Sequence, residues 1–127
     1  MPYINAEDNR REKLRNGEPA SIAGELNYQI FYYTKYYYKK SYDYKSDILQ
    51  LVEAFLRPKV CYQRYNDLTG CLLLCAKEIK RRLKIDVEKT FKKIIDSYDD
   101  EIAKYEDKKI KENGDVEWIK QLWQLLI

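Results

Sequence analysis

The chain has 127 residues, 35% of them charged, a mean hydropathy of −0.72 and a formal net charge of +3. This length is enough for one core of moderate size, and the apolar runs are far too short to cross a membrane. There is no histidine, the commonest general base, and the four glycines form no phosphate-binding loop. The N-terminus also lacks the apolar core of a signal peptide. We therefore expect a cytoplasmic binding protein without a cofactor, rather than an enzyme.

The charges are unevenly distributed. Residues 61–95 carry nine basic and four acidic side chains, a net of +5, whereas residues 96–127 carry five basic and nine acidic ones, a net of −4. A basic middle can attract an anionic ligand, or it can attract the acidic tail of another subunit. The alternative is that both are ordinary solvated helix surfaces.

The N-terminal half is expected to form three helices. The first spans residues 6–16, capped by Asn5 and ended by Asn16-Gly17. The second spans Leu26–Tyr37, because apolar residues recur at steps of three and four: Ile22, Leu26, Ile30, Tyr33 and Tyr37. It contains six aromatics between Phe31 and Tyr38, so a wide aromatic face is predicted although these residues favour strands.

The third helix is expected to begin at Ser46 or Asp47 and to end before Pro58, with an inward face of Ile48, Leu51, Val52, Phe55 and Leu56. The fourth shows the clearest stripe: Cys61, Tyr65, Leu68, Leu72, Cys75, Ile79 and Leu83. Gly70 inside it indicates the close approach of a neighbouring helix. The three cysteines match no zinc-site spacing and are interpreted as packed thiols.

A fifth helix is predicted from Asp86 to Asn113, with the stripe Val87, Phe91, Ile94, Tyr98, Ile102 and Tyr105. Asp115 then caps a last helix that runs to Ile127 and is apolar on most sides. Such a helix needs a second surface, which favours a homo-oligomer with a contact formed by Trp118, Leu122, Trp123 and Leu126. The prediction is an all-α bundle of five to six helices in a single domain over residues 1–127.

Several segments resemble a family of small uncharacterised proteins found in tailed phages and bacteria. The matching pieces are "MPYI" at the start, "GELNY" over residues 24–28, "YND" over residues 65–67 and "YEDKKIKENGDV" over residues 105–116. Residues 42–58 and 84–104 look like additional helical material. The resemblance implies an all-α fold and a phage or prophage setting, with no known reaction and no catalytic residues.

The candidate binding residues combine rings with positive charge. Tyrosines can stack on a planar ligand, and arginines can bind its phosphate or carboxylate. The sequence-based candidates for a ligand site are Tyr28, Tyr32, Tyr36, Tyr65, Arg81 and Arg82. The alternative for both arginines is an ion pair with Glu78 on the surface of the same helix.

The acidic cluster Asp96, Asp99, Asp100 and Glu101 could bind a divalent cation, but no facing pair of carboxylates accompanies it. We therefore interpret it as an exposed helix surface and expect no metal site. Three functional hypotheses follow. The first is sequestration of a small anionic, nucleotide-like ligand, in a counter-defence role by analogy. The second is blocking of a host protein through the C-terminal helix, and the third is weak binding of nucleic acid.

Overall fold

The structure is a computed structural model that describes residues 9–112, and it confirms the all-α class: no strand occurs within that range. Its helices are α1 (Arg10–Arg15), α2 (Ala23–Tyr37), α3 (Tyr44–Leu56), α4 (Tyr62–Leu83), α5 (Glu88–Asp96) and α6 (Asp99–Glu112). A 3-10 turn, Arg57–Lys59, follows α3. None of these helices combines the length and hydropathy needed to span a membrane. Asn5 and the predicted helix 115–127, with its contact residues, lie outside the described range.

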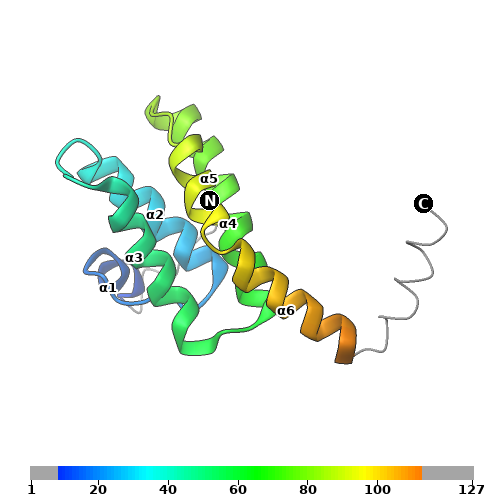
Figure 1. Ribbon diagram of the computed structural model, residues 1–127. Coiled ribbons are helices and arrows are strands. Elements are labelled where there is room, and N and C mark those ends of the chain that lie inside the picture. Colours follow the sequence, from blue (N-terminus) through cyan, green and yellow to red (C-terminus); the bar gives the residue numbers. More distant parts are fainter. Residues whose placement is uncertain (1–8, 113–127) are drawn as a thin grey trace. The chain divides into compact units, whose positions relative to one another are not determined.

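The chain forms two compact units, Met1–Ser97 and Tyr98–Ile127. In the first, α2 and α4 run in the same direction and α3 and α5 run in the opposite one (Figure 1). The direction follows from two thiol contacts, Cys71 Sγ to the Ala23 carbonyl and Cys75 Sγ to the Asn27 carbonyl, which advance by four residues on both helices. In the second unit, α6 is the described element. The expectation of one domain over residues 1–127 stays a prediction.

The core of the first unit consists of the residues at helical spacing. The largest fully buried side chains are Leu14, Leu26, Ile30, Ile48, Phe55, Leu56, Tyr65, Leu68, Leu72, Ile79, Phe91 and Ile94. Removing each such side chain from water stabilises the folded state by roughly 1.5–3 kcal/mol. The α4 stripe is therefore buried as predicted over Tyr65–Ile79, and its two ends are half-buried.

The aromatic stretch is helical through Tyr37, as its period predicts, but the buried face of α2 differs from the predicted stripe. Ile22 is 62% exposed and Tyr37 is 41% exposed, so the predicted stripe reaches the surface at both ends. Thr34 is completely buried instead. Its hydroxyl donates to the Ile30 carbonyl at 2.9 Å and is paired with the Tyr44 hydroxyl, so burial leaves no polar atom unsatisfied there.

Three local predictions were wrong. The cap of α3 is Asp43, whose Oδ1 accepts from the backbone N–H of Ser46 at 3.1 Å, so the helix begins before Ser46. Gly70 does not mark a close helix approach among residues 9–112, because a Cβ placed there would meet none of their atoms within 4 Å. The predicted fifth helix is interrupted after Asp96, where the hydroxyl of Ser97 donates to the Ile94 carbonyl at 2.5 Å. Acidic side chains then fill the first turn of α6, a typical helix start.

Candidate functional site

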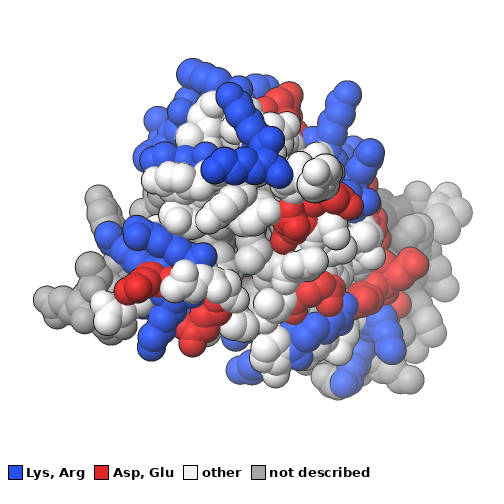
Figure 2. Space-filling model, turned by 90° about the vertical axis from the view of Figure 1, so that its left-hand side faces the viewer, with Lys and Arg blue, Asp and Glu red and all other residues white. Residues whose placement is uncertain are grey.

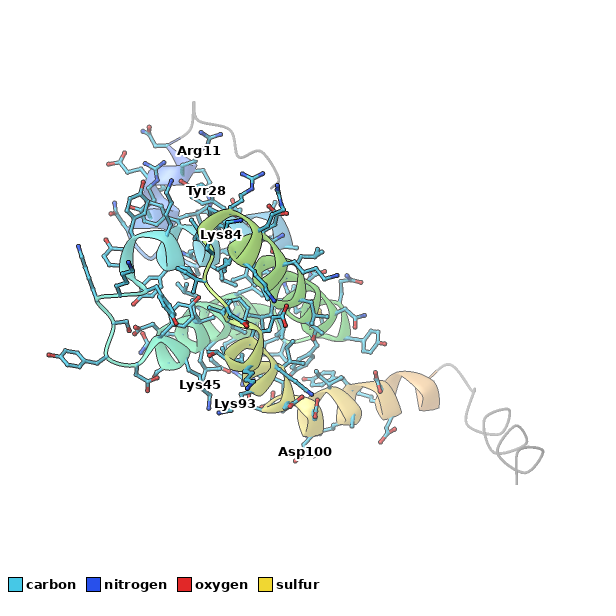
Figure 3. All side chains as sticks on the ribbon, turned by 90° about the horizontal axis from the view of Figure 1, so that it is seen from above. Arg11, Tyr28, Lys45, Lys84, Lys93 and Asp100 are labelled. Carbon is cyan, nitrogen blue, oxygen red and sulfur yellow. The ribbon has the colours of Figure 1, made fainter. Side chains whose placement is uncertain are left out.

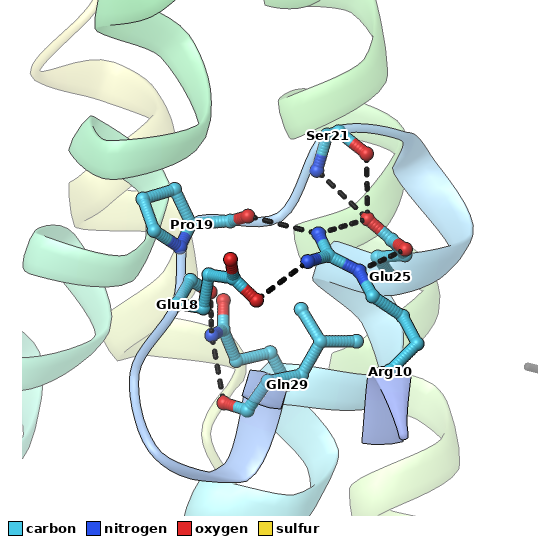
Figure 4. Close-up of polar contacts among 7 residues, drawn as sticks. Arg10, Glu18, Pro19, Ser21, Glu25 and Gln29 are labelled. Carbon is cyan, nitrogen blue, oxygen red and sulfur yellow. Dashed lines mark hydrogen bonds and ion pairs between the residues drawn. The ribbon is translucent and has the colours of Figure 1, made fainter. Parts of the chain in front are cut away.

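The segment between α1 and α2 is held down by one arginine. Arg10 donates to both carboxylate oxygens of Glu25 at 2.5 and 2.7 Å, to Glu18 at 2.8 Å and to the Pro19 carbonyl at 3.0 Å (Figure 4). The N–H and hydroxyl of Ser21 donate to the same Glu25 carboxylate at 2.9 and 2.7 Å. These hydrogen bonds, that from Arg10 first, lower the pKa of Glu25 to about 2 despite its burial. The cluster therefore fixes α1 against the start of α2.

Gln29 on α2 makes the second attachment. Its Nε2 donates to the Leu14 carbonyl at 2.9 Å and to the Glu18 carbonyl at 2.8 Å. Leu14 itself is buried, with 1% of its surface exposed. The next residue in the chain is Arg15, whose side chain is exposed. Because Gln29 binds the carbonyl of the preceding residue, Leu14, it also holds the backbone of Arg15 near α2.

Arg15 lies over a row of rings on α2 that we call the tyrosine ladder: Tyr28, Tyr32 and Tyr36. Its Nε donates to the Tyr28 hydroxyl at 2.7 Å, and its guanidinium carbon lies 5.9 Å from the Tyr28 ring centroid and 5.3 Å from that of Tyr32. Figure 3 shows Tyr28 beside α1. Successive ladder centroids are 6.3 and 4.7 Å apart. Distances of this size are typical of cation–π contacts and of aromatic pairs.

Only one nitrogen of the Arg15 guanidinium, Nε, is engaged by a hydrogen bond from within the described part of the chain. The hydrogen bond to Tyr28 engages Nε and raises the pKa of Arg15 above its ordinary value. Within residues 9–112, neither of its two terminal nitrogens has a hydrogen-bond partner. The side chain is therefore a permanent cation, fixed in orientation by two rings and one hydroxyl, with its donors available to an anion.

A pocket of about 290 Å³, which we call the tyrosine pocket, opens beside the ladder. It lies between the α1–α2 segment, α2 and α3, and Tyr32, Tyr33, Tyr37 and Leu51 supply its apolar walls. Arg15, Gln29 and Asp47 supply polar groups. At roughly 30 Å³ per water, this space corresponds to about ten water molecules, near the lower limit of small-molecule sites.

A larger pocket, of about 440 Å³, lies between α4 and α5. Its walls are apolar, with Leu72, Leu73, Ala76 and Phe91, and the charged residues that line it are exposed. No buried polar side chain lines this pocket. It therefore offers little chemistry that would distinguish one ligand from another.

The structure brings three of the predicted site residues together and separates the others from them. Tyr28, Tyr32 and Tyr36 form the ladder, whereas Tyr65 is a core residue with 1% of its surface exposed. Arg81 donates to Glu78 at 2.8 and 3.2 Å, and Arg82 donates to the same carboxylate at 2.8 Å.

The structure thus shows the surface ion-pair alternative for both arginines, and these bonds lower the pKa of Glu78. A contact of either arginine with a ligand stays a prediction. Sequence reasoning did not find Arg15, Gln29 or Asp47. Only the packing of the α1–α2 segment, α2 and α3 brings them to one place, and no motif marks them.

Positive charge collects at one end of the first unit. Because α2 and α4 are parallel, Lys35 in the last turn of α2 and Lys80, Arg81 and Arg82 in the last turn of α4 point to the same end. Figure 2 shows Lys and Arg gathered at the top of the molecule. Cations are favoured at helix C-termini, so the distribution has a structural cause, and it also attracts anions.

No group of three or more acidic or cysteine side chains that could hold a metal ion occurs among the described residues. Asp96 ends α5, and Asp99, Asp100 and Glu101 occupy the first turn of α6.

The cysteines are free thiols, two of them buried. Burial raises the pKa of Cys71 to about 12, and it raises the pKa of Cys75 as well. A thiol reacts as its thiolate, so both groups are packed side chains rather than nucleophiles.

Comparisons with protein-family models, with curated proteins and with solved structures found no match to this chain. The resemblance to small phage and bacterial proteins therefore stays a prediction.

Proposed function

We propose that the chain binds and sequesters a small anionic, nucleotide-like ligand at the surface formed by Arg15 and the tyrosine ladder. The observation that carries this proposal is the orientation of Arg15, fixed by Tyr28 and Tyr32 while its terminal nitrogens have no partner in the described part of the chain. A planar guanidinium held in this way can bind a phosphate through two parallel hydrogen bonds. The adjoining rings offer a stacking surface to a base, worth roughly 1–3 kcal/mol per base.

The charge distribution supports the same ligand class. The basic end of the first unit would raise the local concentration of an anion and speed its association. We assign binding and no reaction, because the sequence offers neither a histidine nor a phosphate-binding loop. The counter-defence setting, the blocking of a host protein and the binding of nucleic acid stay predictions from the sequence.

Calorimetric titration of the full chain with a panel of mononucleotides and cyclic nucleotides tests the proposal. We expect binding to at least one of them, and a loss of at least tenfold in affinity for Arg15→Gln, since the variant removes the cation over the ladder. Arg15→Lys keeps the charge but not the planar fork, so it should recover only part of the affinity. The matched control is Lys13→Gln, which removes one exposed positive charge from the same helix.

The pair Arg81→Gln and Arg82→Gln provides a second comparison. Both side chains are engaged by Glu78, so we expect their removal to weaken binding less than Arg15→Gln does. The proposal fails if no nucleotide of the panel binds at millimolar concentration. It also fails if Arg15→Gln binds as tightly as the unaltered chain.

A further inference from the structure

Gln29 is a buried amide with one unused acceptor. Only 3% of the residue is exposed, and it lines the tyrosine pocket. Its Nε2 donates to two backbone carbonyls, which fixes the orientation of the amide because the opposite orientation would place an oxygen against both carbonyls. Oε1 is buried and has no hydrogen-bond partner within residues 9–112. A buried acceptor without a donor is unfavourable, so this amide is a polar group that the described fold leaves unsatisfied beside the pocket.

Asp47 adds a second acceptor to the same pocket. Its Oδ2 accepts from the Tyr33 hydroxyl at 2.6 Å and from the Ser41 hydroxyl. These two bonds, that from Ser41 first, keep the pKa of Asp47 below its ordinary value, so the group is a carboxylate at neutral pH. Oδ1 has no partner among the described residues. Asp47, which lines the pocket from α3, thus keeps one unused acceptor, Oδ1.

We propose that the tyrosine pocket takes the hydrogen-bond-donating edge of a planar nitrogen heterocycle, a base with adjacent N–H groups of the guanine type. This inference rests on the proposed function, in which Arg15 binds the anionic group of the same ligand. Adjacent ring and amino N–H donors can share the one unused carboxylate oxygen, Asp47 Oδ1, and the tyrosine walls match the faces of the ring. An edge made of carbonyl acceptors would be repelled by Asp47.

The pocket disfavours an organic cation, the other class of ligand that a carboxylate among tyrosines could take. Arg15 lines the same pocket and carries a permanent positive charge. A ligand with a neutral donor edge and an anionic far end satisfies both Asp47 and Arg15. A cationic ligand satisfies only Asp47 and is repelled by Arg15.

The test compares guanosine, inosine, adenosine and uridine monophosphates by calorimetry on the full chain. Inosine monophosphate lacks only the amino group of the guanine edge. We expect guanosine monophosphate to bind at least tenfold more tightly than each of the others. Asp47→Asn should reduce this preference to less than threefold, because the amide can turn a donor toward the edge. Asp67→Asn, the same change on α4 outside the pocket, should leave the preference unaltered.

The outcomes separate this inference from the proposed function. If the four nucleotides bind equally, and Arg15→Gln abolishes binding of all of them, base recognition in the pocket is refuted while anion binding stands. If none binds, both proposals fail. Tighter binding of choline than of guanosine monophosphate also overturns the inference. Should Asp47→Asn fail to fold, the base preference of the unaltered chain decides the question alone.

Discussion

At the scale of single residues, the position of α1 depends on ionised side chains rather than on apolar contact alone. Glu25 is 8% exposed and receives hydrogen bonds from Arg10 and Ser21. A buried carboxylate is stable only when paired, so removal of either partner leaves an uncompensated charge. The orientation of Arg15 depends on this arrangement, because Arg10 and Arg15 belong to the same short helix.

The stability of the chain should therefore fall in acid through Glu25. Folding lowers the pKa of this carboxyl from its ordinary 4.5 to about 2, so its stabilising contribution is complete above pH 4.5 and is lost as the pH falls toward 2. The shift corresponds to about 3 kcal/mol in the free energy of unfolding. Urea unfolding at a series of pH values should show this loss in the unaltered chain and not in Glu25→Gln.

The matched control is Glu12→Gln, which neutralises an exposed glutamate on α1. It should reproduce the pH dependence of the unaltered chain. Parallel stability profiles for Glu25→Gln and the unaltered chain between pH 7 and pH 2 would contradict the assignment.

At the scale of the elements, two glycines differ in whether the backbone requires them. Gly70 lies inside α4, and no described residue fills the space beside it. Gly17, between α1 and α2, has a φ of 93°, a value that residues with a side chain rarely adopt. One glycine is therefore dispensable and the other is required by the backbone.

We expect Gly70→Ala to raise the free energy of unfolding by roughly 0.5–1 kcal/mol, because alanine restricts the unfolded chain and favours the helix. Gly17→Ala should lower it by about 1 kcal/mol or more, because the conformation strains any side chain. Chemical denaturation measures both. A destabilised Gly70→Ala would mean that another surface covers this part of α4.

At the scale of the whole molecule, the sequence predicts self-association through the C-terminal segment. The sequence predicts a C-terminal helix that is apolar on most sides and lies outside the described residues; its predicted contact residues are Trp118, Leu122, Trp123 and Leu126. Exposure of several such side chains would favour association, at about 1.5–3 kcal/mol for each one buried. A symmetric oligomer is the commonest result.

Sedimentation velocity should accordingly show an oligomer for the unaltered chain and a monomer, or insoluble protein, for Trp123→Glu. The neighbouring change Gln124→Glu adds the same charge on the polar strip of the predicted helix, so it should leave the oligomer intact. A soluble monomer of the unaltered chain would refute the prediction.

The sequence by itself determined the helical class and most of the core, because burial on one face imposes a spacing of three and four residues. Ile30, Leu72 and Phe91 are therefore core residues both in the pattern and in the structure. The same pattern failed where a polar group decides the local geometry, as at Asp43, Thr34 and Ser97. A hydrogen-bonded side chain can begin a helix, enter the core or end a helix without changing the apolar period.

The candidate site was decided almost entirely by the tertiary structure. The spacing of four residues places Tyr28, Tyr32 and Tyr36 on one side of a helix. No pattern in the sequence predicts that Arg15, Gln29 and Asp47 lie next to them. These residues come from three elements, and hydrogen bonds of Arg10 and Gln29 to distant partners bring the first element onto the second. Contacts of this kind join single residues far apart in the chain, so they leave no periodic signal that a sequence could show.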